Sequence, residues 1–280
     1  MISFPNAKVN LGLHIVSKRP DGFHNLETVF APIPFSDVLE IIPAKEETSF
    51  RQSGIIVDTR PDDNLCMKAY QLLKKDFPQI ADVEMWLHKV IPFGAGLGGG
   101  SADASFTLRL LNDIFELHLS GEKLQQYASQ LGSDCAFFIE NKPMFAKGKG
   151  DEFEKIDLDV SNYCWVIVKP SFSISTPEAY AGITPKTPEI PLKEVIKLPV
   201  AEWKDKLTND FENHLFVKYP ELRNLKEQLY NSGAVYASLS GSGSALFGIF
   251  EKLDEGHISE HFPMFKLHYK NEKLLTFTQD

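Results

Sequence analysis

Alternating apolar residues near the start of the chain predict a long β-strand. Within residues 4–16 every second position is apolar: Ala7, Val9, Leu11, Leu13 and Ile15. Strand side chains return to the same face every two residues, so these positions are expected to face a core. Lys8 and Asn10 then share the opposite face of the strand.

The same reading of hydrophobic period and of turn residues predicts the remaining elements. Strands are expected at residues 26–33, 37–42, 83–91, 163–169, 235–240 and 245–250, with two short β-rich runs around Asn271. Helices are expected at residues 62–77, where Asp63 can cap, and at 101–117, 121–131, 210–217 and 221–230. The four prolines within residues 183–201 favour a surface connection there.

In the first half of the chain this order of elements mixes helices and strands without a strict βαβ alternation. The best candidate for a domain boundary lies within residues 147–162, where Gly148 and Gly150 sit among charged residues. We therefore expect one domain at residues 1–155 and a second at residues 156–280.

Composition narrows the function classes. The chain of 280 residues has 43% hydrophobic and 24% charged residues, as is ordinary for a soluble globular protein. A net charge of −9 argues against general nucleic-acid binding, which needs a basic surface. No run of residues is long and apolar enough for a membrane span, and no targeting segment is evident. Three widely spaced cysteines, Cys66, Cys135 and Cys164, predict reduced, buried thiols and a cytoplasmic location.

The most informative segment is a glycine-rich loop between a predicted strand and a predicted helix. Half of residues 92–101 are glycine. Glycine allows positive φ and close approach of a ligand, and successive amides together with a helix N-terminus make a phosphate site. Ser101 could cap the helix or turn its hydroxyl towards a phosphate or a magnesium ion. A flexible hinge is the alternative reading of the same glycines.

Several better-known loops are excluded. No Gly-Lys-Ser/Thr ends the segment, as a Walker A motif requires. No acidic residue closes a second strand about 20 residues later, as a dinucleotide-binding fold requires. His-Arg-Asp and Asp-Phe-Gly elements of protein kinases are absent from the sequence.

Residues 92–104, with the sequence PFGAGLGGGSADA, resemble the phosphate-loop motif of the GHMP kinase superfamily. Residues 7–11 resemble the first motif of that superfamily, and residues 239–247 resemble the third. Residues 19–26, 131–138 and 173–177 further resemble the branch that acts on a cytidine diphosphate-linked methylerythritol, in the non-mevalonate route to isoprenoids. The resemblance covers residues 2–250. It implies an α+β protein of two domains, a ribosomal-protein-S5-like N-terminal domain and a ferredoxin-like C-terminal domain, with substrate and ATP meeting in a cleft between them.

The resemblance also implies catalytic roles for Lys8 and Asp134. Asp134 follows Gly132 and Ser133 and precedes an apolar run, and a carboxylate at such a buried edge needs a cationic partner. Lys8 is the natural partner. On the residues alone, a turn-forming Asp134 and a solvated Lys8 are the commoner readings. By resemblance, Asp134 accepts the proton of the substrate 2-hydroxyl, and Lys8 orients and polarises the pair.

The remaining site residues follow from the resemblance. Phe23, His24 and Tyr180 are expected to form the cytidine pocket, with Asn10 against the erythritol part; core packing is the alternative for the two aromatic residues. Thr176, Gly241 and Ser242 are expected to help place the substrate phosphates. ATP is expected to bind Asn64, Lys89 and the loop, which consists of Pro92, Phe93, Gly94, Ala95, Gly96, Leu97, Gly98, Gly99, Gly100, Ser101 and Ala102. A helix cap at Asn64 and an exposed Lys89 are nearly equal alternatives.

ATP and Mg²⁺ are the expected cofactors, with no dedicated metal site in the protein. The expected partner is a small-molecule substrate, with no nucleic acid or membrane, and the expected state is a monomer or weak homodimer. Two rival functions stay open. One is a GHMP kinase acting on homoserine or mevalonate, which has no need of Phe23, His24 and Tyr180. The other is a nucleotide-binding protein without catalysis, which has no need of a functional Lys8–Asp134 pair.

Overall fold

A computed structural model describes residues 1–56, 60 and 63–279. The chain divides into two compact units. Unit 1 comprises residues 1–8, 35–93 and 98–142, and unit 2 comprises residues 9–34, 94–97 and 143–280. The chain therefore passes between the units several times. The domain boundary expected between residues 155 and 156 stays a prediction.

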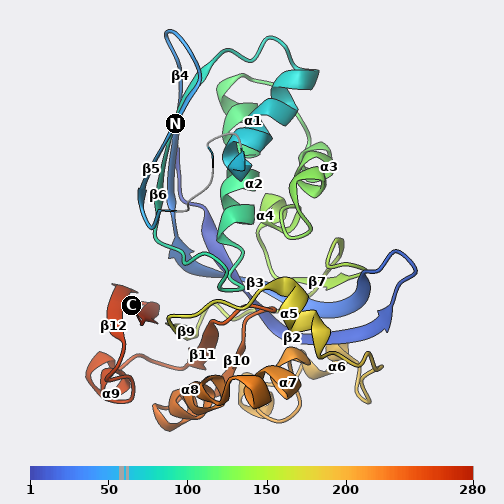
Figure 1. The fold of residues 1–280 in the computed structure, drawn as a ribbon, viewed down its shortest axis with the longest axis vertical. Helices are drawn as coiled ribbons and strands as arrows, with labels where there is room; N and C mark the ends of the chain where they lie inside the picture. The colour runs from blue at the N-terminus through green and yellow to red at the C-terminus, as the bar shows by residue number, and fades with distance from the viewer. Residues whose placement is uncertain (57–59, 61–62, 280) are drawn as a thin grey trace. The chain divides into compact units, whose positions relative to one another are not determined.

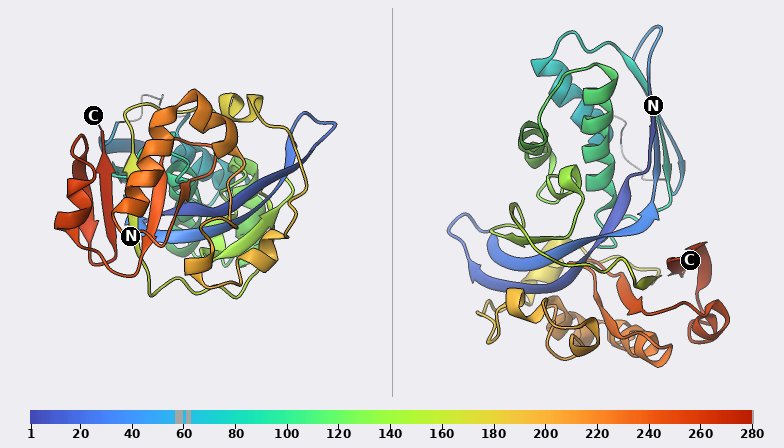
Figure 2. Two further views of the ribbon diagram at one scale, coloured as in Figure 1. Left: turned by 90° about the horizontal axis from the view of Figure 1, so that it is seen from below. Right: turned by 180° about the vertical axis from the view of Figure 1, so that it is seen from behind.

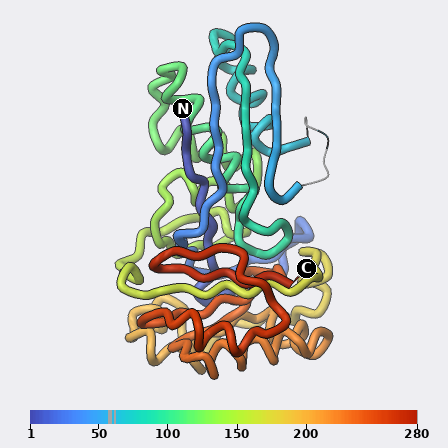
Figure 3. The backbone as a smooth tube through the Cα atoms, turned by 90° about the vertical axis from the view of Figure 1, so that its left-hand side faces the viewer, coloured from blue at the N-terminus to red at the C-terminus, as the bar shows by residue number. Residues whose placement is uncertain are grey.

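Unit 1 contains a four-stranded sheet. Its order is β1 (Ile2–Ser3), β4 (Val38–Pro43), β6 (Val83–Lys89) and β5 (Ser49–Gly54), seen side by side in Figure 3. β4 pairs antiparallel with β1 and β6, whereas β5 runs parallel to β6. Along β6 the inward residues Val83, Met85 and Leu87 are buried, which is the period-two pattern of a sheet covered on one face.

Helices cover one face of this sheet (Figure 1). They are α1 (Leu65–Asp76), α2 (Gly99–Ile114), α3 (Gly121–Leu131) and α4 (Phe137–Glu140). α2 is buried along most of its length because it packs against α1, α3, α4 and β4. A helix placed in this way holds its N-terminus rigidly, and the glycine-rich loop leads directly into that N-terminus.

Unit 2 contains two sheets. The first has the order β2 (Asn6–Lys18), β3 (His24–Ser36), β7 (Met144–Lys147) and β8 (Glu152–Lys155). Residues 6–8 of β2 and 35–36 of β3 belong to unit 1. The second sheet has the order β10 (Tyr236–Leu239), β11 (Leu246–Phe250), β9 (Cys164–Lys169), β13 (Leu274–Thr278) and β12 (Lys266–Asn271).

Two helices, α7 (Phe211–Lys218) and α8 (Pro220–Asn231), cover the second sheet, as Figure 2 shows from below. Their apolar residues, with those of β9, β10 and β11, form the core of unit 2. Shorter helices complete the unit: α5 (Thr176–Ala181), α6 (Leu192–Val195), the 3₁₀ turn Val200–Glu202 and α9 (Glu255–Glu260). Both units combine sheets and helices, as expected for an α+β protein.

Most elements predicted from periodicity are present. All five apolar residues of the alternating N-terminal segment are buried in β2, and α3 spans residues 121–131 as predicted. The strand β5 was not predicted, since its residues Ser49–Gly54 carry little apolar signal. Short helices α6 and Val200–Glu202 interrupt the connection expected at residues 183–201.

Two helix starts differ from expectation. Asn64, not Asp63, caps α1, because its side-chain oxygen accepts a hydrogen bond from the amide of Cys66 at 2.9 Å. Asp62, where this helix was expected to begin, lies outside the described residues. Helix α2 begins at Gly99, within the glycines, with Gly98 as its N-cap residue. Ser101 therefore lies inside the first turn of α2 and does not cap it.

The three cysteines are buried and free of disulfides, as expected. Burial, aided slightly by the Asp134 carboxylate, raises the pKa of the Cys135 thiol to about 11. Cys135 is therefore a thiol at neutral pH. Among the helices of the described residues, none has the length and apolar character that crossing a membrane requires.

Candidate active site

The glycine-rich loop adopts the backbone conformation that its composition predicts. Gly94, Gly96 and Gly98 have φ values of 66°, 81° and 72°, in the left-handed region that favours glycine. Among the described residues, the amides of residues 94–101 donate no hydrogen bond to another backbone group. With the first amides of α2, they form an extended set of donors that an anion can accept.

Lys8 packs against the end of this loop within unit 1. A Cβ atom added to Gly98 would lie 3.1 Å from both Cγ and Cε of Lys8 and 3.0 Å from the ring of Phe138. Any side chain at position 98 would therefore push against the lysine. The absence of a side chain lets the Lys8 stem run directly beside the backbone that begins α2.

The side chain of Lys8 also reaches Asp134. The distance from Lys8 Nζ to Asp134 Oδ2 is 3.3 Å, and both residues belong to unit 1. Asp134 lies in the turn between α3 and α4, and its side chain is 33% exposed, whereas that of Lys8 is 4% exposed. A sheltered cation thus accompanies a carboxylate that solvent or a ligand can reach.

A second group of charges lies beneath the start of α2. Lys89 Nζ contacts Asp37 Oδ2 at 2.5 Å and Asp103 Oδ2 at 2.7 Å, and all three residues are buried. Asp37 Oδ1 also accepts the amides of Val90 and Ile91. These contacts link the end of β6, before the glycine-rich loop, to the second turn of α2, after it. They therefore fix the chain on both sides of the loop.

Burial dominates the electrostatics of this group. It raises the pKa of Asp103 to about 7, against the opposing effect of the Lys89 ammonium and with a further increase from Asp37. Asp103 Oδ1 is buried and has no hydrogen-bond partner among the described residues. For Lys89, burial lowers the pKa, but the two carboxylates outweigh it and the net shift is upward.

In unit 2, the glycine-rich loop touches the glycine loop of the third motif. Ser240 Oγ donates a hydrogen bond to Gly96 O at 2.9 Å, and Ala245 N donates to Ala95 O at 3.2 Å. A Cβ atom on Gly96 would lie 1.9 Å from Ser240 O, and one on Gly243 would lie 2.2 Å from Gly96 N. Glycine is therefore required on both sides of this contact.

The aromatic residues expected around a cytidine all belong to unit 2. His24 and Tyr180 stack with ring centroids 4.9 Å apart, and Tyr180 meets Phe211 edge-on at 5.0 Å. Phe23 is 59% exposed, and the ammonium of Lys149 lies 5.3 Å from its ring centroid. Rings that are exposed or half-buried can offer a base a surface on which to stack.

The other expected site residues lie in varied settings. Asn10 is buried in β2 and donates from Nδ2 to Thr28 Oγ1 at 3.0 Å. Thr176 begins α5 and is exposed. Lys89, for which an exposed position was the alternative, is buried and paired. Asn64 serves as the α1 cap. The binding roles expected for these residues stay predictions.

Sequence reasoning missed the buried polar residues Asp37, Asp103 and Asn209. Asn209 donates from Nδ2 to Leu239 O at 3.0 Å and to Gly241 O at 2.9 Å, next to the third-motif loop. The available signals were weak: Asp103 interrupts the small residues that begin a buried helix, and Asn209 precedes an Asp at a predicted helix start.

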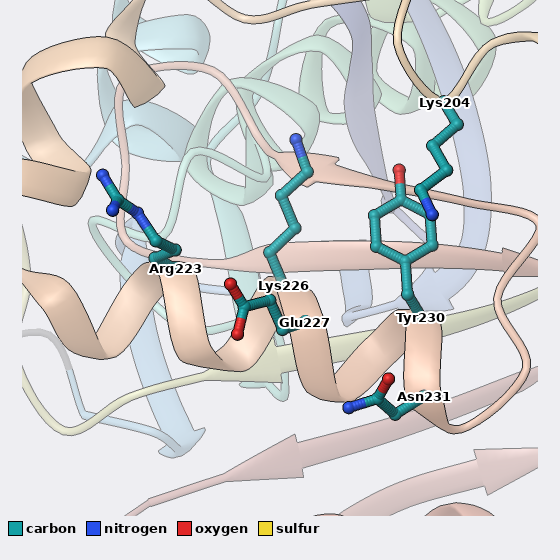
Figure 4. Close-up of a pocket in the computed structure, with 6 residues that line it drawn as sticks. All are labelled: Lys204, Arg223, Lys226, Glu227, Tyr230 and Asn231. Atoms are coloured by element: carbon teal, nitrogen blue, oxygen red, sulfur yellow. The ribbon is translucent and has the colours of Figure 1, made fainter.

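A cavity of about 340 Å³ lies along α8 (Figure 4), and its lining includes none of the residues expected in the site. Its lining comprises Lys204, Arg223, Lys226, Glu227, Tyr230 and Asn231. Two of its cations already have partners, since Lys226 pairs with Glu212 at 2.6 Å and Lys204 lies 4.7 Å over the ring of Tyr230.

Comparison with known families identifies two matching regions. Residues 64–142 match the family described as GHMP kinases N terminal domain, and residues 192–260 match GHMP kinases C terminal. Together the two matches span more than half of the chain. The first contains Asp134 and the glycine-rich loop, and the second contains the third-motif loop.

Curated relatives match almost the whole chain. A 4-diphosphocytidyl-2-C-methyl-D-erythritol kinase of Parabacteroides distasonis is 53% identical over 252 residues, covering 90% of this chain and 92% of the relative. One from Bacteroides thetaiotaomicron is 52% identical and covers 93% and 95%.

Solved structures agree in fold. A crystal structure of a 4-(cytidine 5'-diphospho)-2C-methyl-D-erythritol kinase superposes with a TM-score of 0.79 at 30% identity, covering 93% of each chain. A mevalonate kinase shares the fold, with a TM-score of 0.67 at 13% identity over 94% of each chain.

Proposed function

This chain belongs to the 4-diphosphocytidyl-2-C-methyl-D-erythritol kinases, within the GHMP kinases, and on that premise we propose how its residues perform the reaction. The enzyme transfers the γ-phosphoryl group of ATP to an alcohol of 4-diphosphocytidyl-2-C-methyl-D-erythritol, in the synthesis of isoprenoid precursors. We assign the acceptor as the 2-hydroxyl of the methylerythritol. A monomer or weak homodimer in the cytoplasm stays the expected state.

Asp134 acts as the general base in this proposal. Its carboxylate accepts the proton of the substrate hydroxyl, whose oxygen then bonds to the γ-phosphorus. The bond from that phosphorus to the β,γ-bridging oxygen breaks, and ADP leaves with the electron pair. The observation that carries the assignment is the 3.3 Å approach of Lys8 Nζ to Asp134 Oδ2 beside Gly98.

Lys8 orients Asp134 and polarises the reacting oxygen. Its ammonium is sheltered, so its charge is weakly screened by water and acts strongly on groups close to it. Its stem lies against Gly98, so its position is tied to the backbone at the end of the phosphate loop. Charge and position together suit a transition state in which negative charge develops.

Residues 92–102 are proposed to hold the ATP phosphates through their amides, with Asn64 and Lys89 on the adenosine side. The left-handed glycines at 94, 96 and 98 and the available amides support this role. The ammonium of Lys89 is already paired with Asp37 and Asp103.

Mg²⁺ is proposed as the companion ion of ATP, where it neutralises phosphate charge. Among the described residues, no three His, Cys, Asp or Glu side chains gather as a metal site. Magnesium that binds together with ATP is held mainly by phosphate oxygens and water, as in many kinases, and so does not need such a cluster. The Ser101 hydroxyl, in the first turn of α2, is the candidate protein ligand.

Phe23, His24 and Tyr180 are proposed to bind the cytosine. The stacked His24–Tyr180 pair fixes one ring orientation, and His24 offers ring nitrogens for the base edge. Asn10 is assigned to the erythritol part, and Thr176, Gly241 and Ser242 to the substrate phosphates. These residues distinguish the cytidylated substrate from homoserine and mevalonate, which carry no base.

A substrate panel tests the function. Purified protein with ATP and Mg²⁺ is offered 4-diphosphocytidyl-2-C-methyl-D-erythritol, homoserine or mevalonate, and new phosphomonoester is followed by ³¹P NMR. We expect turnover with the cytidylated alcohol alone. Turnover confined to homoserine or mevalonate would replace the substrate assignment, and ATP binding without transfer to any alcohol would favour a non-catalytic protein.

A further inference from the structure

A buried polar segment, residues 209–212, spans the start of α7 and lies beside the third-motif loop, residues 240–243. Three of its residues, Asn209, Asp210 and Glu212, direct their polar atoms to other parts of unit 2. Asn209 is 2% exposed and Asp210 is 6% exposed. Buried polar side chains almost always form hydrogen bonds, and these bonds fix the groups that they join. The hydrogen-bond partners of this segment therefore show which parts of unit 2 it positions.

Asn209 holds both sides of Ser240. Its Nδ2 donates to Leu239 O at 3.0 Å and to Gly241 O at 2.9 Å, while its Oδ1 accepts the amide of Phe211 at 3.0 Å. Both amide hydrogens are therefore used, and the side chain is itself fixed by the start of α7. No other type of side chain of this size presents two donors and an acceptor in one plane.

Glu212 fixes the strand that enters the same loop. Its Oε1 accepts the amide of Leu239 and the hydroxyl of Ser238, each at 2.9 Å. Its Oε2 pairs with Lys226, whose side chain extends from α8 in Figure 4. Both polar backbone atoms of Leu239 are thus held by the segment before and within the first turn of α7.

The loop so held contacts the phosphate loop directly. Ser240 presents its hydroxyl to Gly96 O, and its carbonyl oxygen lies where a side chain on Gly96 would have to sit. Gly241 has a φ of 58°, and neither Gly96 nor Gly243 carries a side chain that packing could lock. Gly96 and Gly243 therefore keep one backbone conformation only when neighbouring groups restrain them.

We propose that Asn209 is a positioning residue for phosphate binding: it sets the conformation of residues 240–243 and, through Ser240, that of residues 94–97. It touches neither ATP nor substrate. The proposal rests on the proposed function only in treating both loops as phosphate-binding elements. Loss of Asn209 leaves two buried carbonyls without donors and frees the loop that supports Gly96.

The experiment compares three variants. Asn209→Ala removes the clamp, and Ser240→Ala removes the contact with Gly96 while leaving the clamp intact. Ser238→Ala is the matched control. Ser238 is also a buried serine, it lies on β10 just before the loop, and it bonds to Glu212 rather than to Gly96. For each we measure the Kd of ATP by titration calorimetry, KM for both substrates, kcat and the thermal midpoint.

We expect Asn209→Ala to raise the Kd of ATP and both KM values about tenfold, equivalent to about 1.4 kcal/mol. Ser240→Ala should raise the Kd of ATP several-fold, and Ser238→Ala should leave it within about twofold of wild type. A purely structural Asn209 would lower the thermal midpoint with Kd and KM unchanged, which would overturn the proposal.

Two further results would also distinguish the positioning role of Asn209 from the proposed function. If Asn209→Ala does not fold, an unchanged Kd for ATP in Ser240→Ala overturns the proposal, and a raised Kd supports it. If wild-type protein binds ATP but phosphorylates none of the alcohols, the proposed function fails, while the Kd values of the variants still test the positioning role.

Discussion

Lys8 and Asp134 lie 3.3 Å apart but differ sharply in exposure, since the lysine side chain is 4% exposed and the aspartate 33%. The lysine is held from behind by the backbone at Gly98, and the carboxylate remains open. This asymmetry suits a pair in which one member meets the substrate and the other orients it. It also makes the two residues separable by mutation.

Replacing Asp134 removes the base and leaves the phosphate loop in place. We expect Asp134→Asn, and equally Asp134→Ala, to lower kcat by about 100- to 10,000-fold, the usual contribution of a general base. The Kd of ATP, measured by calorimetry, should change by less than about threefold, because no loop amide is altered. Turnover at the wild-type rate would refute the assignment of Asp134.

Replacing Lys8 removes the orienting charge. We expect Lys8→Met to lower kcat by about 100-fold, comparable to the loss of one electrostatic contact in a transition state. Lys18→Met, at the exposed end of the same strand, is the control for charge and length. Steady-state kinetics at saturating ATP would contradict the role of Lys8 if both variants kept the wild-type kcat.

Gly96 tests the contact between the two glycine loops. An alanine there would place Cβ 1.9 Å from Ser240 O at a φ of 81°. We expect Gly96→Ala to weaken ATP binding at least about tenfold, because αL backbone costs an L-residue about 1–2 kcal/mol before the clash is counted. Gly256→Ala in α9, where the nearest atom lies at 3.6 Å, should bind ATP normally. Equal affinity in both variants would argue against a rigid contact.

Asp103 makes stability depend on pH. Burial raises its pKa to about 7 in the folded state from an ordinary value of 3.8. The folded state then holds the proton more tightly than the unfolded state, so this contribution is present below about pH 4 and is lost as pH rises to about 7.

Urea unfolding at pH 5 and pH 7 measures this effect. Because asparagine does not titrate, we expect the stability of wild type relative to Asp103→Asn to fall as pH rises. The change is bounded by about 1.4 kcal/mol for each pH unit. A stability difference that is the same at both values would show that Asp103 stays ionised throughout.

Phe23 tests the cytidine pocket. Since stacking on a base contributes about 1–3 kcal/mol, we expect Phe23→Ala to raise KM for the cytidylated substrate by about 5- to 100-fold. KM for ATP should not change. Phe4→Ala, which removes a ring that is 61% exposed compared with 59% for Phe23, is the matched control. An unchanged KM in Phe23→Ala would put the pocket elsewhere.

Local patterns in the sequence were sufficient for most of the fold. The period of two in residues 4–16 became β2, and Gly94, Gly96 and Gly98 adopted left-handed backbone before a buried helix. Such features depend on residues that are close together in the sequence, so they can be predicted from the sequence alone. The glycine-rich loop and its resemblance to a kinase motif could therefore be recognised without a structure.

The sequence alone did not determine the contacts between residues that are far apart in the chain. The sequence suggested that Lys8 suits Asp134, but only the folded chain brings Nζ to 3.3 Å. Nothing local distinguished Lys89 as a buried partner of Asp37 and Asp103, or Asn209 as a clamp on Gly241. Hydrogen bonds and ion pairs of this kind depend on which surfaces meet when helices and sheets pack. Hydrophobic period specifies that a face is buried, and tertiary structure alone decides which polar groups are buried with it.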